Sequence, residues 1–529
     1  MEKFLATETL VIELLLVVSI VAIVVRRLRI PYTVALVVVG LLITFQQPLE
    51  VDLTPELILS LFVPPLLFEA AFHIEFKDLR QNLLPILGLA IPGVLITTFA
   101  VALIVSYGLG IPMASALVFG ALISATDPVA VVSLFKALGA PKRLATLVES
   151  ESLFNDGTAI VIFQLMVAAA IGSAVTGTGE QAESFDLLRS IIDFVRVAAG
   201  GLMIGVGLGW LIAQIIARVD DYLVETTLTT VLAFGAFLLA ERFHVSGVLA
   251  VVAAGIITGN VGPKGMSPTT RIVLFNFWEY LAFIANSLVF LLIGLEVNMR
   301  EIGASIVPIA VALAAVMVSR LVVVYGITSL INLRLKEVPL PASFQHVLFW
   351  GGLRGAISLA LALSLPLAIP ERDLLRTMTF GVVLFTLLGQ GTTMQYLMRR
   401  LGIGQAHELE LEYERRHAKL MAAQAALQSV RKLQSGKMIS ESTWLRLEPQ
   451  LSQEVEEAIA AQQALISEHP HLQHEETEDA QIEALRAKRA ALGEMLSNGV
   501  ISDLIHDELV TEVDSEIEKT SGRLEPIEE

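Results

Sequence analysis

Long apolar runs alternate with short polar stretches through the first 400 residues of the chain. An α-helix rises about 1.5 Å per residue, so about 20 apolar residues cross the ~30 Å hydrocarbon core of a bilayer. Lipid permits only helices and closed barrels, and these runs are too long and continuous for barrel strands. The pattern predicts an all-α polytopic membrane protein with thirteen spans, over residues 10–25, 31–46, 56–72, 83–107, 112–135, 144–171, 190–217, 226–242, 245–259, 270–297, 303–332, 343–366 and 373–401.

Two of the predicted spans are interrupted. The fifth contains Thr126-Asp127-Pro128, and the twelfth contains the glycine-rich segment 351–355. Proline removes a backbone donor and opens the helix, which frees carbonyl groups. The two breaks lie seven spans apart, as expected if spans 1–6 and 8–13 are repeats of inverted topology. Paired broken helices predict a binding site near the bilayer midplane, as in transporters.

Composition separates a membrane part from an acidic tail. The chain has 529 residues, of which 54% are hydrophobic, and a mean hydropathy of +0.70, which excludes an ordinary soluble protein. Its net charge is −17, yet residues 402–529 alone hold 26 acidic and 12 basic side chains. We therefore expect a transmembrane domain over 1–401 and a small acidic helical domain over 402–529. The acidity argues against nucleic acid as a partner.

Loop charges predict the orientation. An odd number of spans places the termini on opposite sides, and with the C-terminus inside, fifteen Lys and Arg residues lie at inner loops against five at outer ends. Positive residues favour the cytoplasmic side. We therefore expect the N-terminus outside and the tail in the cytoplasm. The short acidic tail favours a bacterial plasma membrane.

A polar cluster in the sixth span predicts the position of the functional site. Asp156 lies near its middle beside Asn155, and charges at membrane depth are expensive and usually functional. A desolvated carboxylate needs either a proton or a cation, and a hard cation takes several oxygen ligands. Competition between the two is the minimal mechanism of an exchanger, whereas the alternative is a carboxylate in a structural salt bridge. Ser152 and Thr126 offer further oxygens. Glu69 in the third span is either a ligand of the cation or a residue that stays hydrated near the membrane–water interface.

Four other charged residues suit structural roles. Where two broken helices cross, an acid offsets the positive N-terminal ends and a base offsets the negative C-terminal ends. Asp127 and Arg354 are placed to do this. Arg320 lies in the middle of the eleventh span and needs a partner, for which Glu151 is favoured over Glu149.

Three motifs together resemble a known family. They are SATDPVAV, ESESLFNDGTAIVIF and GGLRGAISLAL, and they occur in the family's order on the expected spans. Residues from about 10 to 401 resemble the monovalent cation:proton antiporter family 1, of the NhaP and sodium/proton exchanger type. The resemblance implies an NhaA-like fold with crossed discontinuous helices, a homodimer in lipid, and elevator-like alternating access. It also implies exchange of Na⁺, or of Li⁺ or K⁺, for H⁺ without a resident cofactor.

The resemblance also assigns roles to residues of the site. Asp156 resembles the ion- and proton-binding aspartate, and its asparagine neighbour Asn155 is expected among the cation ligands. Glu69, Thr126 and Ser152 resemble the remaining cation ligands. A single aspartate beside a neutral asparagine implies electroneutral one-for-one exchange.

The same resemblance covers the structural residues. Glu151 with Arg320 resembles the pair that links the sixth and eleventh helices. Asp127 and Arg354 resemble the residues that compensate the helix crossing.

Other interpretations of the sequence stay open. A K⁺/H⁺ antiporter of the same fold fits the same residues, because selectivity depends on cavity size and ligand flexibility. A cation channel would differ by passing current without obligatory proton counterflow. An intramembrane aspartyl protease is disfavoured, because the chain has no GxGD element. His469, His471 and His474 in the tail could sense pH or bind a metal, but a solvated loop is the favoured explanation.

Overall fold

The computed structural model describes residues 2–28, 32–46, 58–175, 187–219, 221–262, 268–296, 299–334, 339–403 and 405–469, together with scattered residues between 477 and 516. The chain divides into two compact units, Met1–Gln405 and Ala406–Glu529. Within the described residues every regular element is helical.

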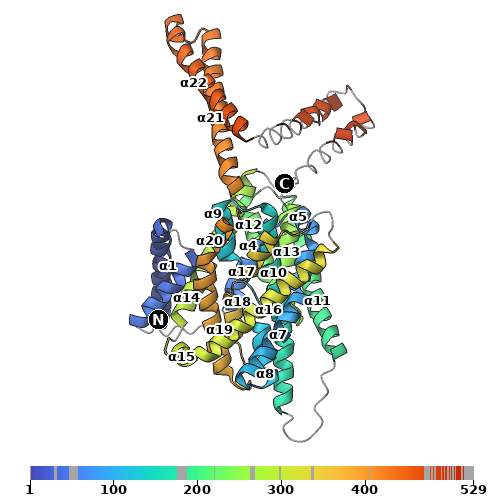
Figure 1. Cartoon of the computed structure of the whole chain (residues 1–529). Coiled ribbons are helices and arrows are strands. Elements are labelled where there is room, and N and C mark those ends of the chain that lie inside the picture. Colours follow the sequence, from blue (N-terminus) through green and yellow to red (C-terminus); the bar gives the residue numbers. More distant parts are fainter. Residues whose placement is uncertain are drawn as a thin grey trace. The chain divides into compact units, whose positions relative to one another are not determined.

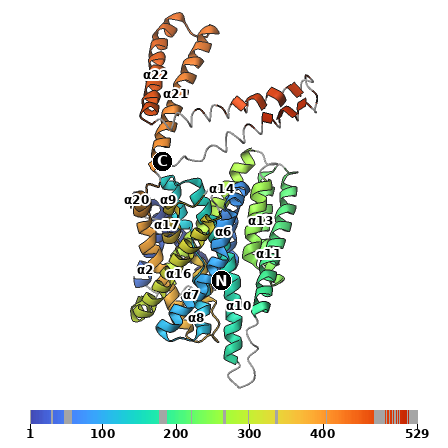
Figure 2. The same ribbon diagram turned by 45° about the vertical axis from the view of Figure 1, so that its right-hand side comes forward.

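The first half of the larger unit is a series of helices that lie side by side (Figures 1 and 2). In chain order they are α1 (Glu2–Leu28), α2 (Tyr32–Gln46), the π-helix η1 (Ile58–Phe62), α4 (Val63–His73), α5 (Phe76–Gln81), α6 (Leu83–Ala90), α7 (Pro92–Leu109), α8 (Met113–Leu122), α9 (Val129–Leu138), α10 (Lys142–Val175) and α11 (Leu187–Ile216).

The second half continues in the same way. Its elements are α12 (Tyr222–Arg242), α13 (Gly247–Val261), α14 (Pro268–Glu296), α15 (Met299–Ala304), α16 (Ile306–Asn332), α17 (Ala342–Trp350), α18 (Ala356–Leu363), α19 (Arg372–Phe385), the π-helix η3 (Thr386–Gly391) and α20 (Thr392–Arg400).

Helices lie within all thirteen ranges that the hydropathy pattern predicts as spans. Seven described helical stretches are long and apolar enough to cross a membrane: Leu83–Leu109, Lys142–Gly172, Ile192–Ile216, Tyr222–Arg242, Thr270–Glu296, Ile306–Asn332 and Arg372–Arg400. Five more apolar helices are shorter. The protein is therefore an all-helical integral membrane protein, and the count of thirteen crossings stays a prediction.

Local sequence explains several helix ends. The Asp221 carboxylate accepts hydrogen bonds from the backbone N–H groups of Leu223 and Val224 and so caps α12. The Ser246 hydroxyl caps α13 in the same way. At the other end, Gly139 closes α9 with a positive φ of 62°, a conformation that glycine adopts without a steric penalty.

Small residues bring α11, α13 and α4 close together. Gly205 of α11 lies against the carbonyl oxygen of Ala250, and Gly259 of α13 lies against that of Phe72, so that an added methyl group would overlap either carbonyl. Glycine permits this close backbone approach between apolar helices. This packing holds α4 beside the helices of the polar site.

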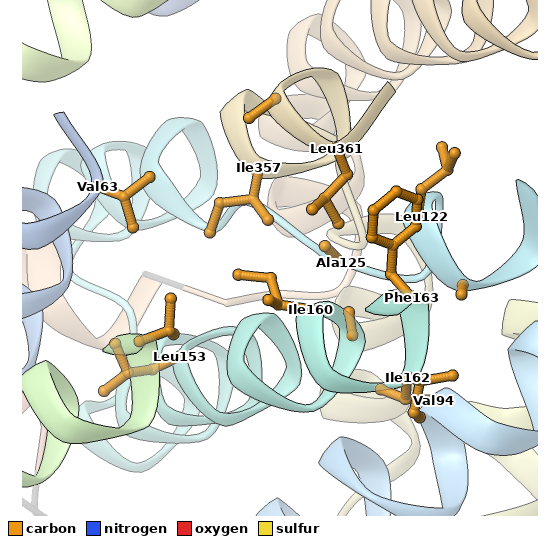
Figure 3. Close-up of a cluster of buried hydrophobic side chains, with 14 of the residues drawn as sticks. Val63, Val94, Leu122, Ala125, Leu153, Ile160, Ile162, Phe163, Ile357 and Leu361 are labelled. Carbon is orange, nitrogen blue, oxygen red and sulfur yellow. The ribbon is translucent and has the colours of Figure 1, made fainter. Parts of the chain in front are cut away.

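The hydrophobic core also surrounds the first helix break. Figure 3 shows Ile357 of α18 facing Ile160 of α10, with Ala125 of the break beside them. All three side chains are buried in one cluster, so the first helix break lies inside the hydrophobic core.

The smaller unit contains two long helices, α21 (Gln405–Ser435) and α22 (Glu441–Glu468). Arg416 Nη1 of α21 donates a 2.7 Å hydrogen bond to the carbonyl oxygen of Ala461 in α22. The Ser440 hydroxyl caps α22. His469 follows α22 directly, whereas His471 and His474 lie outside the described residues.

Candidate functional site

The two helix breaks meet inside the bundle. The chain leaves helical structure between α8 and α9 and again between α17 and α18. The backbone N–H of Asp127 donates a 2.8 Å hydrogen bond to the carbonyl oxygen of Leu353, which joins one break to the other. Gly355 lies so close to the Asp127 carboxylate that a Cβ atom there would overlap it. The crossing therefore requires a residue without a side chain at position 355.

Two opposite charges satisfy the helix ends at this crossing. Arg354, which is 1% exposed, donates from Nη1 to the carbonyl oxygens of Ser124 (2.7 Å) and Ala125 (3.0 Å) at the end of α8. Asp127 Oδ1 accepts a 3.0 Å hydrogen bond from the N–H of Val129 at the start of α9, and the same carboxylate accepts from the N–H of Ala356 at the start of α18. A cation at a helix C-terminus and an anion at helix N-termini both stabilise the helix dipoles.

A second pair of charges links α16 to α10. Arg320 donates from Nη1 to Glu151 Oε1 at 2.8 Å and from Nη2 to Glu151 Oε2 at 3.0 Å. Nη2 also donates to the carbonyl oxygen of Leu348 at 2.9 Å, near the end of α17. Both side chains are buried, so the ion pair fixes the position of α10 against the second broken helix. The carboxylate that Arg320 holds is that of Glu151, not that of Glu149.

Hydroxyl and amide groups surround the first break next to Asp156. Thr126 Oγ1 lies 2.9 Å from Ser152 Oγ and accepts a 3.1 Å hydrogen bond from Asn155 Nδ2. The Asp156 carboxylate accepts a hydrogen bond from the backbone N–H of Thr126. The structure thus brings four of the predicted ligands together.

Asp156 faces a cavity of about 80 Å³. Its Oδ1 is buried and has no hydrogen-bond partner among the described residues. The polar side chains that line the cavity with it are those of Thr126, Asp127, Glu149, Asn286 and Ser358, and most of the remaining wall is apolar. A buried carboxylate oxygen without a hydrogen-bond donor is stabilised either by a bound cation or by a proton on the carboxylate itself.

Glu69 is placed apart from this group. Its Oε1 lies 3.4 Å from His73 Nδ1, one turn further along α4, and its side chain is 23% exposed. It does not line the cavity, which the neighbouring residues Leu66, Leu67 and Ala70 do.

Sequence reasoning missed three polar residues of the cavity wall as site residues. Glu149 is seven residues before Asp156, a spacing that puts both on one face of a helix and could have revealed it. Asn286 on α14 and Ser358 on α18 had no such local signal, because only packing brings those helices to α10.

Comparisons with known proteins agree with this architecture. A family profile described as "Sodium/hydrogen exchanger, transmembrane" matches residues 14–400. The chain is 42% identical over 406 residues to the low-affinity Na⁺/H⁺ antiporter NhaS1 of Synechocystis sp., covering 76% of this chain and 75% of the relative. It is 36% identical over 494 residues to the Na⁺/H⁺ antiporter NhaG of Bacillus atrophaeus, covering 90% and 91%. It is 42% identical over 361 residues to the Na⁺/H⁺ antiporter NhaP of Pseudomonas aeruginosa, covering 67% and 83%.

A solved structure shares the fold. The sodium proton antiporter MjNhaP1 from Methanocaldococcus jannaschii at pH 8 superposes with a TM-score of 0.61 at 20% sequence identity, and the match covers 76% of this chain and 99% of that chain. At this identity the likeness concerns the fold.

Proposed function

Since the chain belongs to the sodium/hydrogen exchanger family, we propose that it is a secondary transporter that exchanges Na⁺ for H⁺ across a membrane. The family and the named relatives are antiporters rather than enzymes. The observation that carries the proposal is the buried, unpartnered Oδ1 of Asp156 at a cavity between two broken helices.

The geometry supports competition at one carboxylate. A carboxylate away from water is too costly to stay bare, so it holds either a proton or a cation. When Na⁺ is bound, the Asp156 carboxylate and the oxygens of Thr126 and Ser152 would surround it. When a proton is bound, Asp156 is neutral and the cation site is lost. The site can change from one side of the membrane to the other when Asp156 holds either ion, but not when its carboxylate is bare. This requirement couples the flux of Na⁺ to the flux of H⁺.

Asn155 supports electroneutral one-for-one exchange. Its Nδ2 is engaged with Thr126, so the residue acts as a neutral neighbour of Asp156 and carries no second proton. Exchange of one Na⁺ for one H⁺ moves no net charge. We further propose thirteen crossings with inverted repeats, elevator-like alternating access and a homodimer in lipid, as the resemblance implies.

The proposed setting is a bacterial plasma membrane with the tail in the cytoplasm. The relatives cited above come from bacteria, and positive residues gather at the predicted inner loops. K⁺ in place of Na⁺ is the second candidate, since the oxygen ligands could hold either ion.

The test is the collapse of a pH gradient in proteoliposomes on addition of Na⁺, Li⁺ or K⁺. The wild-type chain should respond to Na⁺, and Asp156→Asn should abolish the response because an amide cannot carry the proton. Asp373→Asn is the matched control, since the Asp373 side chain is 91% exposed. Activity that survives in a folded Asp156→Asn protein would place the proton carrier elsewhere. A wild-type protein that passes cations without proton counterflow would be a channel.

A further inference from the structure

The cavity extends along α10 beyond Asp156. Glu149 also lines it and lies seven residues earlier on the same helix. Seven residues are about two turns, so the two carboxylates share one helix face about 10 Å apart along the axis. Helical side chains lean toward the N-terminus, so both carboxylates lean toward the Lys142 end and their spacing along the axis is kept.

Asn286 lines the same cavity from a different helix. It lies on α14 and is 9% exposed. Its side chain makes no hydrogen bond with any residue that the structure describes. A carboxamide on the cavity wall that makes no protein hydrogen bond keeps both its donor and its acceptor for an occupant of the cavity.

The charges around Glu149 favour a cation on this side. Lys136 of α9 is the charge that acts most strongly on Glu149, followed by Glu69 and His73 of α4. Glu279 of α14 acts on Glu69. With Glu149 there are three carboxylates in this group, against one lysine and one histidine. Carboxylates that line a cleft with apolar walls raise the local concentration of cations.

We propose that Glu149 and Asn286 form a second cation station in the cavity, on the Lys142 side of Asp156. The station binds a monovalent cation through the Glu149 carboxylate and the Asn286 carbonyl oxygen, with water completing its shell. Hard cations hold oxygen ligands at about 2–2.6 Å, so one ion cannot bind both carboxylates across this spacing. The ion therefore occupies the two stations in turn. This inference rests on the proposed function, since the second station lies on the path by which the transported cation reaches Asp156.

Equilibrium binding of radioactive Na⁺ to the purified full-length chain tests the station. Glu149→Gln and Asn286→Leu should each weaken the apparent Na⁺ affinity about tenfold, which corresponds to about 1.4 kcal/mol. In proteoliposomes they should raise the KM for Na⁺ and leave the maximal rate near that of the wild type. Asp156→Asn should keep weak Na⁺ binding, and adding Glu149→Gln to it should remove that remainder.

Glu13→Gln is the matched control, because it removes one carboxylate from an exposed position on α1. If Glu149→Gln or Asn286→Leu does not fold, Glu149→Asp and Asn286→Ser replace them in the same binding measurement. The proposal fails if folded Glu149 and Asn286 variants keep the wild-type Na⁺ affinity, or if Glu149→Gln abolishes exchange as completely as Asp156→Asn. Failure of the exchange proposal looks different: the wild type would then show no Na⁺-driven proton flux, while two-station Na⁺ binding could still be measured.

Discussion

Arg320 and Glu151 form a buried ion pair with two hydrogen bonds, 2.8 Å and 3.0 Å long, between helices α16 and α10. The same arginine binds the carbonyl oxygen of Leu348 at 2.9 Å. One side chain thus ties the helix that carries Asp156 to the second broken helix. Because α10 also carries Glu149, the pair fixes the wall along which both carboxylates lie.

Removing one partner of this pair should destabilise the protein strongly. Arg320→Ala leaves Glu151 buried without a counter-charge, which costs about 3–5 kcal/mol. The measurement is the thermal midpoint in detergent. Arg196→Ala is the control: it breaks the exposed pair of Arg196 with Asp193, whose expected contribution is below about 1 kcal/mol. Equal effects of the two substitutions would contradict the structural role of Arg320.

Gly355 should not tolerate a methyl group. A Cβ atom there overlaps the Asp127 carboxylate, so Gly355→Ala must displace the residue that caps two helices. We expect a loss of about 1–3 kcal/mol in stability and a large loss of exchange. Gly207→Ala is the control, because nothing lies within 4 Å of the position that its added methyl group would take. A Gly355→Ala protein as stable and active as Gly207→Ala would refute the close crossing.

Asp127 should be replaceable by asparagine more easily than by alanine. Its carboxylate accepts hydrogen bonds at the starts of α9 and α18, and loss of one cap costs about 0.5–2 kcal/mol. Asp127→Ala should therefore lose about 1–4 kcal/mol, while Asp127→Asn keeps an acceptor and loses less. Chemical or thermal unfolding of the two variants side by side measures the difference. Equal losses in the two variants would show that charge, rather than capping, is what the crossing needs.

Protons should weaken the apparent affinity for Na⁺. If both ions compete for Asp156, each proton bound excludes one Na⁺. The KM for Na⁺ should then rise by up to about tenfold per unit as the pH falls, while the maximal rate stays constant. Initial rates over a series of pH values and Na⁺ concentrations give both parameters. A falling maximal rate at constant KM would argue for a separate inhibitory proton site.

Voltage should not drive wild-type exchange. One Na⁺ for one H⁺ moves no net charge, so a potassium diffusion potential should leave the steady-state rate unchanged. Asn155→Asp adds a second carboxylate beside Asp156 and should introduce voltage dependence, because a second proton can then move. Asn155→Ser is the neutral control. Wild-type exchange that follows the voltage would rule out electroneutral coupling.

The sequence determined the elements and their chemistry. Apolar run length predicted where helices lie, because hydropathy and backbone hydrogen bonding are local properties. Proline at 128 and the glycines around Arg354 predicted both breaks, since these residues act on their own backbone. Asp156, Asn155, Ser152 and Thr126 were predicted as neighbours, and the structure places them together.

Only the tertiary structure decided which other side chains share the cavity. Asn286 and Ser358 come from helices more than 100 residues away from Asp156 in the chain, and packing alone brings them there. It also placed Glu69 beside His73 rather than on the cavity wall. The direction in which a side chain points depends on how its helix is rotated against its neighbours. In a helix that is apolar nearly all round, the sequence holds little record of that rotation.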